Sequence, residues 1–292
     1  MILVAGATGS LGGRIARAVV ARGIPVRALA RPTSDAAALQ SAGISVVHGD
    51  VKDPTSLARA CDAVDIVITT VSASKRNDDS IENVDLRGNQ NLIDAAEAAG
   101  VRHFIFVSTI AASQDAPLPL FRAKAAAETR LRGSAMTHTI LSSNGFMDVW
   151  FPMMVELPAF SGQPITLVGE SRRRHSFVAE QDIAAFAAAA LGNAAAHNAT
   201  IVIGGPEAVT FRDVVRAYEE AAGREFPVRS VAPGEPIPGL PEPVWGIAAA
   251  LETFDSPIPM DDTARRFGVT LTSVRDFARS RLAQLTDVSP PA

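Results

Sequence analysis

Short apolar runs alternate with amphipathic stretches over the first half of the chain. Strands are predicted at residues 2–5, 25–30, 44–50, 64–71 and 104–108, with helices between them at 12–21, 34–42, 54–61 and 84–99. A further helix and strand are predicted at 121–132 and 137–141. Nearly continuous apolar strands separated by helices form a parallel sheet that is covered on both faces. The pattern therefore predicts an α/β fold with a Rossmann-like, doubly wound parallel sheet.

The pattern changes after residue 145, where segments rich in proline and aromatic residues alternate with short strands and helices. Helices are predicted at 211–222 and 271–285, and the proline-rich stretch 227–243 is predicted to be an extended surface loop or lid. We expect a Rossmann domain over residues 1–145, to which later segments return. Residues 146–292 are expected to form a smaller C-terminal α+β lobe that binds the substrate.

A glycine-rich turn follows the first strand. Gly6, Gly9 and Gly12 have the spacing G-x-x-G-x-x-G, and the strand, turn, helix and next strand together span residues 2–30. In a dinucleotide site, such glycines allow a tight turn, close approach of a pyrophosphate and close helix packing. The alternative is a purely structural turn, which the surrounding βαβ pattern disfavours.

Nucleotides bind at the carboxyl ends of the strands in this fold. The candidate nucleotide-binding residues at these ends are Gly6, Thr8, Gly9, Ser10, Leu11, Gly12, Arg31, Thr33, Asp50, Val51, Thr70, Val71, Ser72 and Ser108.

The end of the second strand indicates which dinucleotide binds. An NAD site usually has an acidic residue there to accept the ribose 2′-hydroxyl, whereas this chain has Arg31, followed by Thr33 and Ser34. A guanidinium pairs with a 2′-phosphate, so NADP(H) is preferred over NAD(H). Arg31 as a solvated charge is the alternative. Asp50 would bind the adenine amino group or cap the following helix.

Composition narrows the classes of function. The 292 residues are 47% apolar with a net charge of −4, which disfavours nucleic acid as a partner. Cys61 is the only cysteine, so no disulfide forms, and the histidines lack metal-ligand spacing, so no metal is expected. No leader and no long apolar run is seen, so we expect a cytoplasmic protein that does not enter a membrane. A small-molecule substrate and a monomer or homodimer are expected.

Several segments carry a family resemblance that covers residues 1–191. The segments are GATGSLG (6–12), ALARP (28–32), GDVKD (49–53), NLIDAAEAAGVRHFIFVST (91–109), FRAKAAAETRL (121–131) and FVAEQDIAAFAAAAL (177–191). The chain resembles the atypical short-chain dehydrogenase/reductases, and most of all their NmrA-like branch. That branch includes NADPH-dependent quinone reductases, isoflavone-type and ether reductases, and non-catalytic redox-sensing proteins.

The resemblance implies a catalytic site and also shows a departure from it. The wider superfamily uses a Tyr-x-x-x-Lys pair with a Ser or Thr after the fifth strand. Lys124 matches the lysine and Thr109 or Ser108 the hydroxyl, but Leu120 stands at the tyrosine position. Without the phenol, reduction of an already electrophilic acceptor is favoured over alcohol oxidation. The resemblance implies that Lys124 binds the cofactor through a hydrogen bond to the nicotinamide ribose and supplies a proton. Alternatively, Lys124 only pairs with Glu128 one helical turn away.

The loop after the sixth strand differs from its relatives as well, because Ser142-Ser143-Asn144 stands where they often have Arg-Pro. The resemblance places this loop over the nicotinamide, with Asn144 at the cofactor. The apolar side chains that follow would line the substrate site or pack between lobes; they are Phe146, Met147, Trp150 and Phe151. His175 is a candidate replacement proton donor, with a structural role as its alternative.

These observations predict an NADPH-dependent reductase that transfers hydride to a quinone-like or conjugated carbonyl substrate. Two alternatives stay open. One is a regulatory protein that senses NADP(H) without turnover, and the other is a biosynthetic ketoreductase that uses His175 or Thr109 in place of the tyrosine.

Overall fold

The computed structural model describes residues 1–73 and 79–287, which divide into two compact units. Unit 1 comprises Met1–Ser143, Glu180–Val202 and Phe267–Val269. Unit 2 comprises Asn144–Ala179, Ile203–Arg266 and the chain from Thr270 onward.

Unit 1 is built on a sheet of seven strands within the described residues, in the order β3-β2-β1-β4-β5-β6-β8. The strands are β1 (Ile2–Ala5), β2 (Val26–Ala30), β3 (Ser45–His48), β4 (Ile66–Thr69), β5 (His103–Thr109), β6 (Thr137–Ser143) and β8 (Ala199–Ile203). Pairing from β3 through β6 is parallel, and Ile2 is in register with Val26 on one side and Ile66 on the other. The Rossmann-like fold is thus confirmed.

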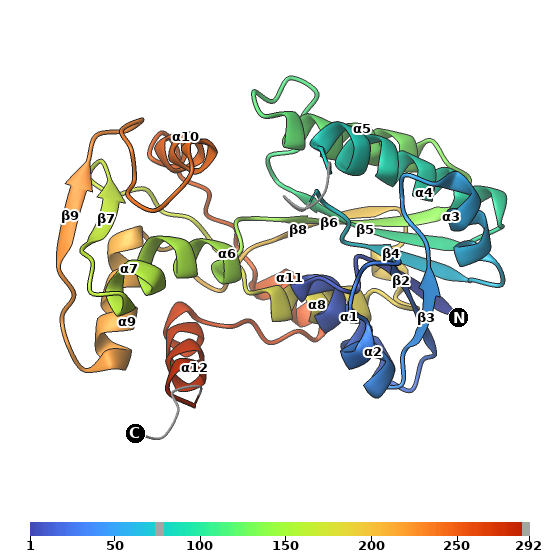
Figure 1. Cartoon of the computed structure of the whole chain (residues 1–292), viewed down its shortest axis with the longest axis horizontal. Helices are drawn as coiled ribbons and strands as arrows, with labels where there is room; N and C mark the ends of the chain where they lie inside the picture. Colours follow the sequence, from blue (N-terminus) through green and yellow to red (C-terminus); the bar gives the residue numbers. More distant parts are fainter. Residues whose placement is uncertain (74–78, 288–292) are drawn as a thin grey trace. The chain divides into compact units, whose positions relative to one another are not determined.

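Helices cover both faces of this sheet. They are α1 (Ser10–Val20), α2 (Ala37–Ser41), α3 (Pro54–Cys61), α4 (Arg87–Ala98), α5 (Pro119–Arg132) and α8 (Glu180–Ala189). Figure 1 shows α3, α4 and α5 on one face and α1 and α8 on the other. Leu3, Val4 and Ala5 are fully buried because a strand between two helical layers has no exposed side.

Two predicted helices differ from the observed ones. The helix expected at 84–99 begins as a π-helical turn, η1 (Ile81–Leu86), and continues as α4, while α2 is shorter than the predicted stretch 34–42. The Ser80 hydroxyl accepts a hydrogen bond from the Asn83 amide, so the helix starts earlier than the apolar pattern does. A short 3₁₀ turn, η3 (Ala194–Ala196), precedes β8.

Unit 2 contains a parallel pair of strands, β7 (Ile165–Val168) and β9 (Val228–Val231). Its helical segments are α6 (Met147–Phe151), η2 (Pro152–Glu156), α7 (Leu157–Phe160), α9 (Phe211–Ala222), α10 (Glu242–Leu251), α11 (Asp261–Phe267, whose last residue lies in unit 1) and α12 (Val274–Asp287). Phe151, Phe177 and Tyr218 are among the largest side chains in its core.

The expectation that residues 227–243 form only an extended loop is wrong, because β9 lies within this stretch and α10 begins at its end. Residues 228–231 contain no proline and pair with β7, and the Pro227 carbonyl accepts a hydrogen bond from the Ile165 amide. The prolines flank the strand, where a missing amide hydrogen costs little.

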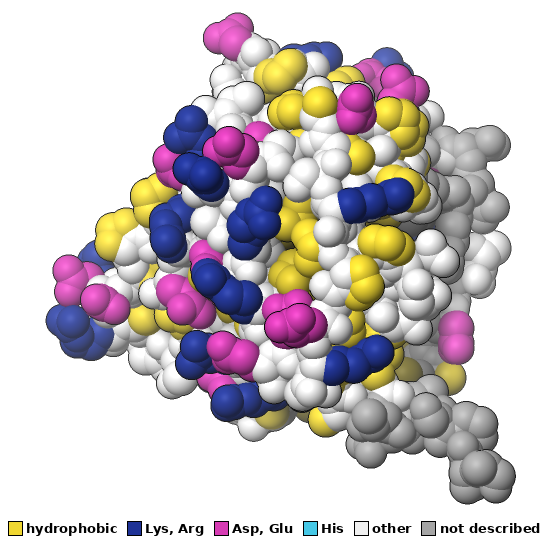
Figure 2. Space-filling view, turned by 90° about the vertical axis from the view of Figure 1, so that its left-hand side faces the viewer, with side chains coloured by type: hydrophobic (Ala, Val, Ile, Leu, Met, Phe, Trp, Pro, Cys, Tyr) yellow, Lys and Arg dark blue, Asp and Glu magenta, His cyan; other side chains and the backbone are white. Residues whose placement is uncertain are grey.

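The face of unit 2 seen in Figure 2 intersperses hydrophobic side chains with charged ones. Arg224 lies over the rings of Phe160 and Phe226, which face each other edge-on. Among the described residues, no helix combines the length and hydropathy needed to cross a bilayer.

Candidate nucleotide-binding site

The glycine-rich turn forms a cradle at the N-terminus of α1. Gly6 has φ +84°, and a Cβ there would lie 2.5 Å from the Thr70 hydroxyl. A Cβ at Gly12 would overlap the Gly6 carbonyl and lie 2.8 Å from the same hydroxyl. At Gly9, by contrast, the one described atom beyond the adjoining residues that a Cβ would meet within 4 Å is the Gly6 oxygen, at 3.3 Å. Gly6 and Gly12 are therefore required by packing, whereas Gly9 leaves room above the turn.

The first turn of α1 offers donors to an anion. Gly9 occupies the N-cap without a side-chain capping bond, and Thr8, Gly9 and Ser10 are exposed, while Leu11 is buried. The first amides of a helix have no intrahelical acceptor and carry the positive end of its dipole. The described residues thus fit the pyrophosphate of a dinucleotide.

A carboxylate from a distant part of the chain lies beside this helix terminus. The Ser10 hydroxyl donates a hydrogen bond to Glu180, and Arg14 Nε lies 3.5 Å from the same carboxylate. Glu180 is the first residue of α8, which packs against α1. The sequence patterns did not identify Glu180, because its role depends on packing between segments some 170 residues apart.

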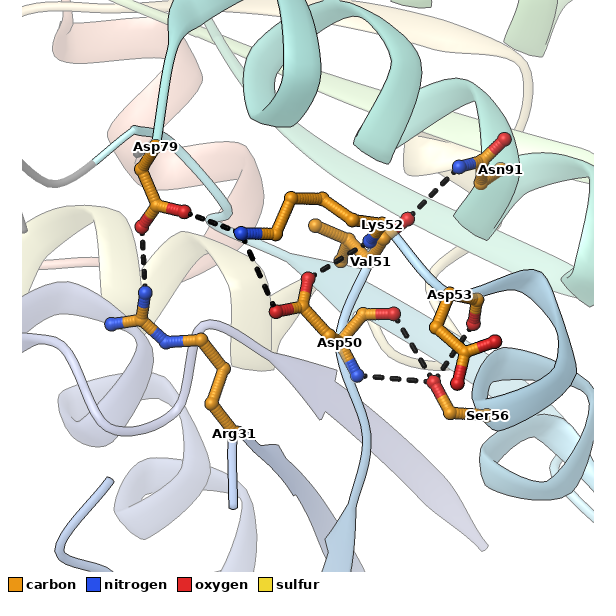
Figure 3. Close-up of polar contacts among 8 residues, drawn as sticks. All are labelled: Arg31, Asp50, Val51, Lys52, Asp53, Ser56, Asp79 and Asn91. Carbon is orange, nitrogen blue, oxygen red and sulfur yellow. Dashed lines mark hydrogen bonds and ion pairs between the residues drawn. The ribbon is translucent and has the colours of Figure 1, made fainter. Parts of the chain in front are cut away.

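Arg31, at the end of β2, belongs to an ionic cluster that also includes the end of β3. Its Nη1 lies 2.6 Å from Asp79 Oδ2, and Lys52 Nζ lies 2.8 Å from Asp79 Oδ1 (Figure 3). Asp50 Oδ2 lies 3.7 Å from Lys52 Nζ. Thr33 is exposed in the turn that follows Arg31. Asp79 and Lys52 were not among the predicted site residues.

Asp50 and Val51 form the turn after β3. The Asp50 carboxylate accepts a bond from the Lys52 amide, and the Ser56 hydroxyl bonds to the Asp50 backbone. Asp53, rather than Asp50, caps α3. Val51 is buried, and its carbonyl accepts from Asn91 (Figure 3). The turn is therefore preformed, and the Asp50 side chain remains partly exposed.

A buried acid holds the loop after β4. The Asp85 carboxylate accepts from the Ser72 hydroxyl at 2.7 Å and from the Ala73 amide at 2.8 Å. Thr70 bonds to the Ala5 carbonyl, which ties this loop to the end of β1. Asp85 is a further residue that sequence reasoning missed, since an acid in a helical stretch is usually solvated.

Lys124 is buried at the carboxyl ends of β4 and β5. Its Nζ is 3.4 Å from the Val71 carbonyl and 3.3 Å from the Val107 carbonyl, and it lies 4.9 Å from the centre of the Phe106 ring. Burial lowers the pKa of this ammonium, while the nearby charges of Asp85 and Glu128 act in the opposite direction. The described contacts of Lys124 do not include an ion pair with Glu128. The structure therefore does not show the alternative in which Lys124 only pairs with Glu128.

Ser108 and Thr109 have different surroundings. The Ser108 hydroxyl is buried and donates to Glu128 Oε1, and Glu128 also pairs with Arg132. Thr109 is half-buried, and its hydroxyl accepts from the Ala111 amide at 3.3 Å. Adjacent strand residues point to opposite faces, so Ser108 shares the α5 face of β5 with Phe106, whereas Thr109 does not.

The position of the usual tyrosine is occupied by Leu120, one turn before Lys124 on α5. Tyr218, the only tyrosine in the chain, lies in unit 2, where its hydroxyl donates to Glu156 in the core. Arg281 pairs with the same carboxylate. Burial is the first cause that raises the Tyr218 pKa, followed by the Glu156 charge. Tyr218 is thus a structural residue.

Two further candidates, His175 and Asn144, lie in unit 2, and both form hydrogen bonds there. His175 Nδ1 accepts from the Ser256 hydroxyl at 2.7 Å and its Nε2 donates to the Leu251 carbonyl at 3.0 Å. Burial lowers the His175 pKa. Asn144 donates to the Ser256 carbonyl and accepts from the Gly145 amide. These contacts favour structural roles for both residues.

The predicted substrate wall divides into two pairs. Met147 and Phe151 are fully buried, and the Phe151 ring meets Phe177 and Phe277 edge-on. Phe146 and Trp150 are only half-buried. The first pair belongs to the core of unit 2, and the second pair retains surface that a substrate could contact.

The profile of the NmrA-like family matches residues 1–255. The chain belongs to the NmrA-like family. Among its relatives, an NAD(P)H azoreductase from Xenophilus azovorans is 31% identical over 232 residues, covering 80% of this NmrA-like chain and 77% of the azoreductase. A photosystem II assembly factor from Trieres chinensis is 29% identical over 230 residues, which cover 79% and 72% of the two chains.

Solved structures resemble this NmrA-like chain over almost its whole length. An NADPH-dependent quinone oxidoreductase from Escherichia coli, complexed with NADPH, superposes with a TM-score of 0.78 at 21% identity and covers 97% of this chain and 100% of its own. A triphenylmethane reductase from Citrobacter complexed with NADP(H) gives 0.79 at 24% identity, with 96% and 99% coverage. At these identities the likeness establishes the fold alone.

Proposed function

We propose that this chain is an NADPH-dependent reductase that transfers hydride to a quinone-like or conjugated carbonyl acceptor. The observation that carries the proposal is Lys124, a buried ammonium with a lowered pKa at the carboxyl ends of β4 and β5, in a chain that has no tyrosine one turn before it. The NAD(P)H azoreductase and the quinone oxidoreductase support the same class of reaction.

Unit 1 serves as the nucleotide-binding domain in this proposal. The amides at the start of α1 bind the pyrophosphate, Asp50 binds the adenine, and Arg31 at the end of β2 favours a 2′-phosphate. A bound reduced nicotinamide supplies the hydride. Two of the solved relatives are named as complexes with NADPH or NADP(H), which supports the preference for NADP(H).

Lys124 supplies the positive charge and the proton. Reduction of a quinone or enone leaves negative charge on oxygen, which a nearby ammonium stabilises in a site of low dielectric. An ammonium with a lowered pKa also gives up its proton more readily than an exposed lysine does. Such acceptors need no phenol to activate them, which is consistent with Leu120 at the tyrosine position.

Unit 2 is proposed to be the substrate lobe, with Phe146 and Trp150 as the apolar contacts. We do not assign a proton-donor role to His175, because its two ring nitrogens are already held by Ser256 and Leu251. The missing tyrosine also supports a second candidate, a regulatory protein that binds NADP(H) without turnover.

Oxidation of NADPH at 340 nm in the presence of benzoquinones, naphthoquinones and conjugated enones tests the proposal. We expect turnover with at least one acceptor, and a Lys124→Met variant with roughly a hundredfold lower kcat, in the range of a lost general acid. Tyr218→Phe is the matched control and retains the wild-type kcat. Tight NADPH binding without oxidation by any acceptor would overturn the reductase and support the sensor.

A further inference from the structure

Asp79 holds two cations that come from different strand ends. Its Oδ2 pairs with Arg31, which follows β2, and its Oδ1 pairs with Lys52, which follows β3. The side chain of Asp79 is only 4% exposed, whereas those of Arg31 and Lys52 are 34% and 36% exposed. The acid thus lies beneath the two cations, which remain open to a ligand.

The charges of the four described members of this cluster cancel. Arg31 and Lys52 contribute two positive charges, and Asp79 and Asp50 contribute two negative ones, with Asp50 Oδ2 3.7 Å from Lys52 Nζ. The bond to Asp79 is the first cause that raises the pKa of Lys52, so the lysine stays protonated. A 2′-phosphate therefore meets an arginine whose charge is already balanced by a carboxylate.

The cluster interacts differently with NADPH, which has a 2′-phosphate, and with NADH, which has a 2′-hydroxyl. A 2′-phosphate is repelled by Asp79 at the same time as Arg31 and Lys52 attract it, so its binding energy is the difference between the two effects. A ribose 2′-hydroxyl carries no charge, and it can donate to a carboxylate. Figure 3 shows Arg31 using one terminal nitrogen toward Asp79 while the other points away, so the guanidinium keeps a donor for a phosphate.

We propose that Asp79 sets the choice between NADPH and NADH, acting as an internal counter-ion that competes with the 2′-phosphate for Arg31 and Lys52. Lys52 is then the second cation of the 2′-phosphate site. The chain accepts both cofactors, with a preference for NADPH smaller than two unopposed cations would give. This inference rests on the nucleotide site of the proposed function, but not on turnover.

Binding of 2′,5′-ADP and 5′-AMP tests the inference without any catalytic readout, because the two nucleotides differ only in the 2′-phosphate. The quantity measured by calorimetry is the ratio of their affinities. Asp79→Asn keeps the shape of the side chain and removes one negative charge. We expect it to raise the ratio about tenfold, as one charge at a partly screened site does. The change should be larger at 50 mM than at 500 mM salt.

Two variants complete the test. Asp53→Asn is the matched control: Asp53 accepts from the Thr55 amide and caps α3, a role that asparagine also fills, and it contacts neither cation in the described structure. Its affinity ratio should equal that of the wild type. Lys52→Gln should lower the ratio about fivefold, since a single positive charge beside the 2′-phosphate is lost.

The outcomes are distinguishable. A ratio that is unchanged or lowered in Asp79→Asn overturns the inference, because the acid would then be irrelevant to, or an orienting support for, the two cations. If Asp79→Asn does not fold, an unchanged ratio in Lys52→Gln overturns it instead. Failure of the wild-type chain to bind either nucleotide overturns the nucleotide site itself, whereas nucleotide binding without turnover leaves the inference standing.

Discussion

Two alanine substitutions in the glycine-rich turn separate the demands of folding from those of the ligand. In Gly12→Ala, the new methyl group would overlap the Gly6 carbonyl oxygen, lie 2.6 Å from the Gly6 carbonyl carbon and lie 2.8 Å from the Thr70 hydroxyl. Backbone atoms must then move, at a cost of about 1–3 kcal/mol in the free energy of unfolding. For a chain of 292 residues, that corresponds to a fall in Tm of roughly 2–5 °C.

Gly9→Ala should have the opposite effects, a small one on stability and a large one on nucleotide affinity. Gly9 has φ −86°, which alanine adopts freely, and the new methyl group has one close contact, 3.3 Å from the Gly6 carbonyl oxygen, which a shift of a few tenths of an ångström relieves. The cost to folding is that of alanine at an N-cap, at most about 1 kcal/mol. The methyl group would instead hold a pyrophosphate away from the amides of α1. Loss of one hydrogen bond to a charged group costs about 1.5–3 kcal/mol, or roughly ten- to a hundredfold in affinity.

Thermal unfolding of the free protein and calorimetric titration with NADPH measure the two effects separately. Gly246→Ala in α10, where a Cβ would meet no atom of the described residues within 4 Å, is the control and should leave NADPH affinity unchanged. Wild-type affinity in Gly9→Ala would refute the placement of the pyrophosphate over this turn. Wild-type stability in Gly12→Ala would refute the packing argument.

The remaining predictions concern buried polar side chains. Burial lowers the pKa of His103 from 6.5 to about 4, so the unfolded chain binds more protons than the folded one between these values, and stability falls as the pH drops through them. This lowering of the pKa corresponds to about 3 kcal/mol. In chemical denaturation from pH 7 to 4, the free energy of unfolding of His103→Phe should therefore depend less on pH than that of the wild type. Parallel pH profiles for the two proteins would contradict this. Tyr218→Phe loses the hydrogen bond to Glu156 and should lower the free energy of unfolding by about 1.5–3 kcal/mol. The kcat and the NADPH affinity should not change. A fall in kcat would show that the tyrosine takes part in the reaction.

Local signals predicted much of the fold. The helices expected at 54–61 and 211–222 agree with the structure, and each has strong end signals. Asp53 caps the first and a proline follows at its start, while Thr210 and Asp213 form a capping box for the second, which Gly223 ends in the left-handed conformation. Such signals lie within a few residues of the element that they end, so the sequence alone contains them.

The acids of the candidate site could not be predicted in this way. Asp79, Asp85 and Glu180 occur in segments where an acidic side chain is usually solvated, and their contacts are with residues brought near by the sheet and the helices that cover it. For the same reason His175 suggested a proton donor, although both of its nitrogens are bound in the folded unit. The sequence shows the type of each of these residues, but the partners of each side chain depend on the tertiary structure.

The position of Glu180 beside α1 has a consequence for biosynthesis. The N-terminal stretch that contains the glycine turn leaves the ribosome long before α8 does, so during translation α1 lacks both its packing neighbour and the acid that holds Ser10. A fragment ending at Ser143 would expose the apolar side of α1 that α8 covers in the complete chain. We therefore expect the nucleotide site to form late, after residues 180–202 have packed into unit 1. Cofactor binding would then indicate that folding is complete, not that it has begun.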